Sequence, residues 1–137
     1  MPEIHLTHSE QETAAIAERF ASTLSPGTFV LLHGDLGAGK TAFVRGLAAG
    51  LGVDTGTVSS PTFVLIQHYK GRLPLIHADL YRLDNPRAIE DLGLDELSEG
   101  AVLAVEWAER LPRMPENSVA VRIEDGGGDT RTITIGV

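Results

Sequence analysis

The chain has 137 residues, a net charge of −8 and no cysteine. This length suits one domain spanning residues 1–137, and the lack of cysteine excludes disulfides and thiolate metal sites and favours a cytoplasmic location. The acidic balance excludes a surface that grips nucleic acid unaided, and no apolar run approaches the roughly 20 residues of a membrane span.

The first predicted elements are a helix and a buried strand. Apolar residues recur at helical spacing over residues 10–24, with Ser9 as the N-cap and Glu12 at the capping-box position. A turn at 25–27 ends this helix. Residues 28–33 then form a continuous apolar run, which is typical of a strand covered on both faces.

Strands and helices alternate through the remaining chain, and the short segment 125–129 predicts a hairpin loop. This order indicates an α/β domain with a mixed, mainly parallel sheet. The later elements are expected as a helix at 40–51, strands at 63–69 and 75–79 joined by a turn at 70–72, a short helix from Pro86 capped by Asp84 or Asn85, a strand at 101–105, and a hairpin of 119–123 with 130–135.

A glycine-rich loop separates the first strand from the second helix. It matches G-x-x-x-x-G-K-[ST] from Gly34 to Thr41. Glycines let successive backbone N–H groups converge on phosphate oxygens, and the helix that follows adds its N-terminal dipole. We expect a nucleoside triphosphate with Mg²⁺ here, with Lys40 on the β- and γ-phosphates and the Thr41 hydroxyl on the metal. The candidate nucleotide-binding residues of this segment are Gly37, Ala38, Gly39, Lys40, Thr41 and Ala42.

Two carboxylates follow apolar strands. Asp79 and Glu106 each lie at the carboxyl end of a predicted strand, where ligands of open α/β sheets gather. Phosphoryl transfer needs a second Mg²⁺ anchor and a group that orients the attacking water. Spacing does not assign these two roles, and either acid could instead cap a turn or pair with Arg82.

Other candidates have two interpretations each. Trp107 either packs in the core or walls the site, and the loop 53–62 is either a nucleotide-responsive switch or an ordinary connection. Arg131 reaches a phosphate or the base, or, by default, is a solvated strand arginine. The histidines are interpreted as structural because no pair has metal-ligand spacing, although His77 shares a strand face with Asp79.

Four blocks in this order resemble the TsaE (YjeE) family. They are Gly-Asp-Leu-Gly-Ala-Gly-Lys-Thr (34–41), Ser-Pro-Thr-Phe (60–63), His-Ala-Asp-Leu-Tyr-Arg-Leu (77–83) and Val-Glu-Trp (105–107). The first is shared with many proteins, whereas the last two are far more specific, and the resemblance extends over nearly the whole chain. It implies a P-loop NTPase-like three-layer sandwich and the ATPase subunit of the bacterial machinery for threonylcarbamoyladenosine modification of tRNA.

The resemblance also implies roles for single residues. Thr41 and Glu106 would hold Mg²⁺, and Asp79 would serve hydrolysis together with Lys40, acting on the attacking water. Ala78 departs from the family, in which a larger residue such as Phe is common, and this bears on packing. The remaining implied site residues are Trp107 beside the active site, Tyr81 and Arg82 in a block needed for function, and Ser9 and Arg131 as nucleotide contacts.

The implied partner is the TsaD–TsaB heterodimer, in which TsaD transfers the threonylcarbamoyl group. ATP hydrolysis, weak without partners, would drive turnover of that complex, and tRNA would be reached only through it. One alternative is a small-molecule P-loop kinase, although no arginine-rich lid follows residue 83. Another is a nucleotide-binding module without hydrolysis, which Asp79 and Glu106 disfavour. No guanine-reading motif is present, and this favours ATP.

Overall fold

The computed structural model describes residues 2–34, 39–54 and 66–136. Gly37, Ala38, the Ser-Pro-Thr-Phe block and most of the loop 53–62 lie outside the described residues. The strands are β1 (Glu3–Thr7), β2 (Phe29–His33), β3 (Ile66–Tyr69), β4 (Leu75–Asp79), β5 (Val102–Glu106), β6 (Ser118–Asp125) and β7 (Arg131–Ile135). The helices are α1 (Glu10–Ala21), α2 (Lys40–Gly50), α3 (Pro86–Glu90), α4 (Leu94–Leu97) and a 3₁₀ turn at Ala108–Arg110.

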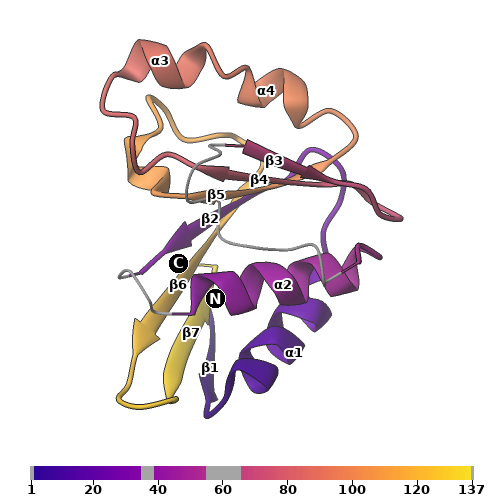
Figure 1. Ribbon diagram of the computed structural model, residues 1–137, viewed down its shortest axis with the longest axis vertical. Coiled ribbons are helices and arrows are strands. Elements are labelled where there is room, and N and C mark those ends of the chain that lie inside the picture. Colours follow the sequence, from indigo (N-terminus) through magenta and orange to yellow (C-terminus); the bar gives the residue numbers. More distant parts are fainter. Residues whose placement is uncertain (1, 35–38, 55–65, 137) are drawn as a thin grey trace.

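The described strands form one mixed sheet in the order β1-β7-β6-β2-β5-β4-β3 (Figure 1). The four central strands run parallel, since β2 pairs with β5 and β6, and β4 pairs with β5. The outer strands β3, β7 and β1 join through antiparallel pairs. The predicted α/β class with a mixed sheet is therefore confirmed, and the carboxyl ends of β2, β4 and β5 meet at one edge.

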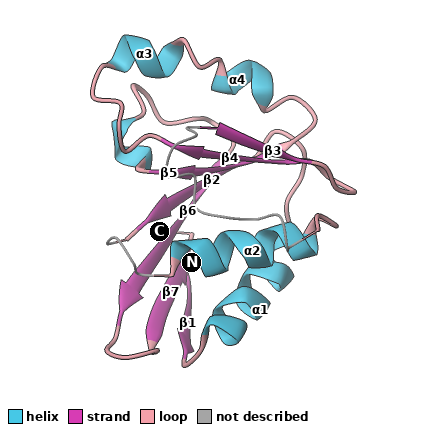
Figure 2. Ribbon diagram, viewed as in Figure 1, coloured by secondary structure: helices cyan, strands magenta, loops and turns pink. Residues whose placement is uncertain are grey.

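Two helical layers cover the sheet (Figure 2). On one face, α1 and α2 pack on alternate strand residues such as Val30 and Leu32. On the other face, α3 and α4 insert Ile89 and Leu94 against a set that includes Leu31. Because β2 is buried on both faces, its sequence is a continuous apolar run rather than an alternating one.

Helices α1 and α2 cross with their backbones in contact. A Cβ atom added at Gly46 would lie 2.2 Å from the Ala14 carbonyl oxygen, and one added at Gly50 would lie 2.5 Å from Ala21 Cβ. Both distances are far below van der Waals contact. The helix that begins at the glycine-rich loop is thus held against α1 without space for another methyl group.

The start of α1 follows the sequence prediction. The Ser9 hydroxyl accepts the Glu12 amide at 3.1 Å, as an N-cap does. The Glu12 carboxylate accepts the amide of His8 rather than that of Ser9. The cap therefore also ties the helix to the end of β1.

The end of α1 differs from the prediction. The helix stops at Ala21, not at residue 24, because the Ser22 and Thr23 hydroxyls donate to the Arg19 and Phe20 carbonyls at 2.6 and 2.7 Å. Such bonds compete with helix continuation. The sequence pattern did not predict strand β1 or helix α4, and the N-cap of α3 is Asn85 rather than Asp84.

None of the described helices is long and apolar enough to cross a membrane.

Candidate functional site

The two described ends of the glycine-rich loop require glycine. Gly34 has a φ of 148°, and a Cβ there would lie 2.4 Å from the carbonyl oxygen of Ile123 on β6. Gly39, which caps α2, has a φ of 98° in the left-handed region. The loop therefore leaves β2 pressed against β6 and enters α2 through a left-handed turn.

Lys40 is the first residue of α2 and is buried, with 6% of its surface exposed. Its Nζ donates to the Gly34 carbonyl at 3.1 Å and lies 3.8 Å from Glu106 Oε1. The ammonium thus lies between the residue that follows β2 and the end of β5. Thr41 is half-buried on the first helical turn, and Ala42 is buried behind it.

Asp79 and Glu106 are partners in the β4–β5 register. Neighbouring strands lie about 4.8 Å apart, so the two acidic residues lie side by side at the sheet edge that carries Lys40. Glu106 is buried, whereas Asp79 is half-buried and its Oδ1 accepts the Tyr81 amide at 2.9 Å. Asp79 therefore combines the two sequence interpretations, since it both closes a turn and lies at the candidate site.

His77 contacts the site, although its sequence interpretation was structural. The ring is fully buried, and Nε2 lies 2.6 Å from Glu106 Oε2. The available signal was its position two residues before Asp79, on the same strand face. Recognising the contact also requires knowing that β4 and β5 are neighbours, which the sequence pattern does not provide.

Trp107 both walls the site and packs on the core. Its ring centroid lies 5.6 Å from Lys40 Nζ and 5.0 Å from the Tyr81 ring, and Arg110 lies over the ring at 5.3 Å. The side chain also packs against the apolar cluster beneath α3 and α4. An open cavity of about 480 Å³ lies here, lined by Leu32, His33, Gly34, Lys40, Tyr81, Trp107, Glu109 and Arg122.

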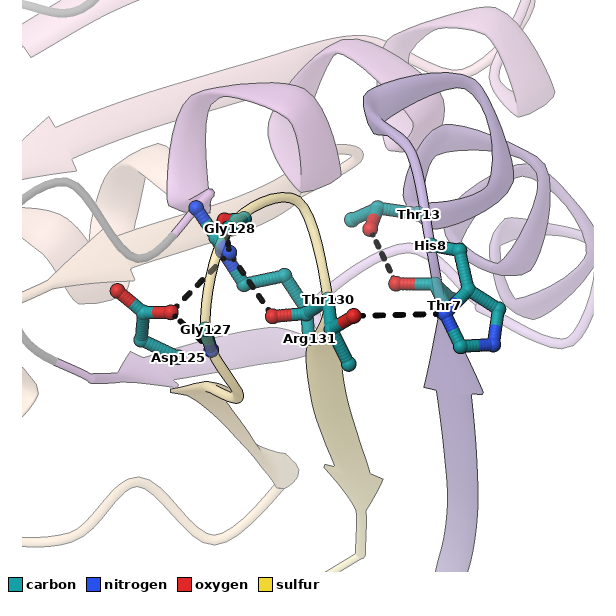
Figure 3. Close-up of polar contacts among 8 residues, drawn as sticks. All are labelled: Thr7, His8, Thr13, Asp125, Gly127, Gly128, Thr130 and Arg131. Atoms are coloured by element: carbon teal, nitrogen blue, oxygen red, sulfur yellow. Dashed lines mark hydrogen bonds and ion pairs between the residues drawn. The ribbon is translucent and has the colours of Figure 1, made fainter.

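Arg131 lies at the turn between β6 and β7, where its side chain makes polar contacts with that turn (Figure 3). Only 17% of its side chain is exposed; Nη1 lies 3.3 Å from Asp125 and donates to the Gly128 carbonyl at 2.7 Å. Its Nε lies 3.6 Å from the position that a Cβ at Gly39 would occupy. The default interpretation of Arg131 as a solvated strand arginine is therefore wrong, because the β6–β7 hairpin turns it toward α2.

The N-terminal segment reaches the same hairpin. His8 Nδ1 lies 3.4 Å from the Thr130 hydroxyl, and Thr7 and Thr13 share a buried hydrogen bond of 2.8 Å (Figure 3). Ser9 follows directly, but its hydroxyl is engaged in the N-cap of α1. The structure thus brings the neighbourhood of Ser9 to the Arg131 hairpin and gives the Ser9 side chain a structural role.

The remaining candidates differ in position. Tyr81 is 54% exposed and lies beside the Trp107 ring, and Arg82 follows it on the surface.

The groups that could hold a divalent cation are the Thr41 hydroxyl and the Glu106 carboxylate. Mg²⁺ is commonly bound through one or two carboxylates together with substrate phosphates and water, so this pair of oxygen donors fits it.

These features define a three-layer α/β domain with a glycine-rich loop and two acids at one sheet edge. The family model described as threonylcarbamoyl adenosine biosynthesis protein TsaE matches residues 7–133. The chain belongs to this family.

Individual members of the family are similar to this chain over most of their length. The chain is 46% identical over 131 residues to the tRNA threonylcarbamoyladenosine biosynthesis protein TsaE of Bacillus subtilis, covering 93% of this chain and 81% of that protein. It is 40% identical to the protein of that name from Nostoc sp., covering 98% and 85%. A crystal structure of Bacillus subtilis YdiB superposes with a TM-score of 0.75 at 38% identity, covering 98% and 84%.

Proposed function

We propose that this chain binds ATP with Mg²⁺ at the sheet edge around Lys40 and hydrolyses it to ADP and phosphate, slowly when alone. The observation that supports this most is the position of Lys40. Its buried ammonium donates to the Gly34 carbonyl and lies 3.8 Å from Glu106, which is the register partner of Asp79. A cation and an acid thus meet at the carboxyl edge of the sheet, and a second acid occupies the neighbouring register position there, where ligands of open α/β folds bind.

Each residue has a separate task in this proposal. Lys40 and the backbone N–H groups at the start of α2 hold phosphate oxygens. Thr41 and Glu106 hold Mg²⁺, which when bound neutralises phosphate charge. Asp79, half-buried and fixed by its bond to the Tyr81 amide, orients the attacking water. Arg131, which the hairpin turns toward Gly39, contacts the nucleotide, and the Ser9 segment lies against the same hairpin.

The family supports a place for this ATPase in tRNA modification. The relatives are described as threonylcarbamoyladenosine biosynthesis proteins, and we extend that pathway to this chain. Its ATPase cycle would act on a TsaD–TsaB complex in the cytoplasm. A net charge of −8 agrees with a subunit that leaves tRNA binding to its partners.

The segment after β4 favours hydrolysis over a kinase reaction. Kinases that transfer phosphate to small molecules close an arginine-bearing lid over it to exclude water. Here the described residues 80–101 carry α3 and α4, which bury Ile89 and Leu94 in the cluster on the face opposite α2. Because α3 and α4 pack on the core in this way, this segment does not serve as a lid over the nucleotide.

The test measures phosphate release and partner binding together. With purified TsaD–TsaB, we expect ATP turnover to rise above that of the isolated chain, and association in a pull-down to depend on ATP. Lys40→Ala should abolish both effects, whereas Lys70→Ala, which removes an exposed lysine from the β3–β4 turn, should leave them unchanged. Association that is indifferent to nucleotide would contradict the assignment to this complex but not the ATPase itself.

A further inference from the structure

The Glu106 carboxylate faces two donors. Oε1 lies 3.8 Å from Lys40 Nζ, and Oε2 lies 2.6 Å from His77 Nε2. The lysine is a long chain whose ammonium also donates to the Gly34 carbonyl. Under the proposed function, which this inference presupposes, that ammonium turns to phosphate when nucleotide binds. His77 then still donates to the carboxylate and can hold it in place.

His77 is built as a rigid support. The ring is fully buried on β4, on the sheet face that also carries Leu75, Val102 and Ala104. Its register partner on β5 is Ala104, whose small side chain leaves room for the ring to reach Glu106 two residues further along β5. Strand pairing on both sides fixes the two backbones, so the side-chain geometry is set before any ligand arrives.

The ring nitrogens differ in their partners. A carboxylate only accepts hydrogen bonds, so Nε2 carries a proton and donates it. Nδ1 is buried and, among the described residues, has no hydrogen-bond partner. The tautomer with its proton on Nδ1 alone would turn the Nε2 lone pair toward the carboxylate of Glu106, so the contact requires a proton on Nε2.

We propose that His77 is a positioning residue: its Nε2–H holds Oε2 of Glu106 so that the carboxylate presents Oε1 toward the metal and phosphate side of the site. Carboxylates that bind metals are themselves oriented by hydrogen bonds from a surrounding shell, and loss of such a partner typically weakens metal affinity about 10–100-fold. His77 would thus act on Mg²⁺ through Glu106 without touching the metal, the nucleotide or the attacking water.

The first test uses calorimetry to measure ADP affinity in the presence of Mg²⁺ and in the presence of EDTA, and compares the two values. His77→Leu should bind ADP in EDTA within about twofold of wild type, which also reports a folded site, but should lose roughly tenfold of its affinity in Mg²⁺. His77→Gln, whose amide can donate from a similar distance, should recover most of that loss. His77→Asn, whose amide is too short, should not. Equal Mg²⁺ dependence in all four proteins would overturn the proposal.

A double-mutant cycle shows whether the effect passes through Glu106. In a Glu106→Ala background, His77→Leu should cause no further change in the Mg²⁺ dependence of ADP binding. An undiminished second loss there would refute the positioning role. If the wild type binds ADP equally well with and without Mg²⁺, the proposed metal site fails, whereas a failure confined to His77 leaves that site standing.

A measurement on the unaltered protein avoids any folding defect of the variants. Nitrogen-15 spectra of the histidine rings should show a proton on His77 Nε2, both in the free protein and with Mg²⁺ and ADP. A His77 ring with a bare Nε2 could not donate to Glu106, and that result would overturn the proposal independently of the variants.

Discussion

Trp107 has the one positive φ found among non-glycine residues in the described parts of the chain, at 60°. A bulky side chain in the left-handed region costs about 1–2 kcal/mol. The residue directly follows Glu106, and its ring lies against Tyr81 and near Lys40. The backbone therefore turns sharply at the end of β5, and this turn places the ring over the site.

This strain can be measured by comparing two truncations. Trp107→Gly and Trp107→Ala both remove the ring contacts, but only glycine adopts the left-handed conformation without steric cost. We expect Trp107→Gly to be more stable than Trp107→Ala by about 1 kcal/mol in urea denaturation followed by circular dichroism. If Trp107→Ala is as stable as Trp107→Gly, the residue is not strained.

At the residue scale, the sequence predicts positions better than contacts. The loop motif and the strand ends at Asp79 and Glu106 follow from local pattern, and the structure has both strands ending at these acids. The contact between His77 and Glu106 does not follow from local pattern, because it depends on which strands are neighbours. The contact between Arg131 and Gly39 does not follow from local pattern either, since the β6–β7 hairpin brings the two residues together.

The pairing of α1 with α2 is the element that fixes the loop helix from behind. Gly46 lies where the two backbones touch, with the Ala14 carbonyl 2.2 Å from the position of an added Cβ. Helix propensity alone would favour alanine over glycine by about 1 kcal/mol. The absence of space opposes this gain.

We expect Gly46→Ala to destabilise the protein by roughly 1–3 kcal/mol, because overpacking forces the helices apart. Arg45→Ala, on the exposed side of the same helix, is the matched control and should change stability by less than about 0.5 kcal/mol. Chemical denaturation of both variants makes the comparison. A Gly46→Ala protein more stable than wild type would mean that α1 and α2 are not in close contact.

Helices and strands with a clear hydrophobic or capping pattern were predictable from the sequence, and elements without such a pattern were not. The hydrophobic runs of β2 and β5 and the caps of α1 and α3 follow from side-chain chemistry. Strand β1 has no such signal because its apolar residues Ile4 and Leu6 are exposed, and it forms only by pairing with β7 at the far end of the chain. Helix α4 has four residues, too few for a periodic pattern.

On the scale of the whole molecule, nucleotide binding should raise the free energy of unfolding. A ligand at 100 times its dissociation constant adds about 2.7 kcal/mol, which for a domain of this size raises the melting temperature by roughly 5–10 °C. We expect this shift with ADP and Mg²⁺ in the wild type and in Lys70→Ala, but not in Lys40→Ala. A shift of the same size in Lys40→Ala would place the nucleotide elsewhere.

The most direct test of the account is phosphate release from ATP by the Asp79→Asn variant. This change keeps the size and the hydrogen-bonding oxygen of the side chain, so the bond to the Tyr81 amide can persist. If Asp79 orients the attacking water, turnover with Mg²⁺ should fall by on the order of 100-fold or more while ADP affinity stays close to that of wild type. Undiminished phosphate release by Asp79→Asn would contradict the proposed hydrolytic site.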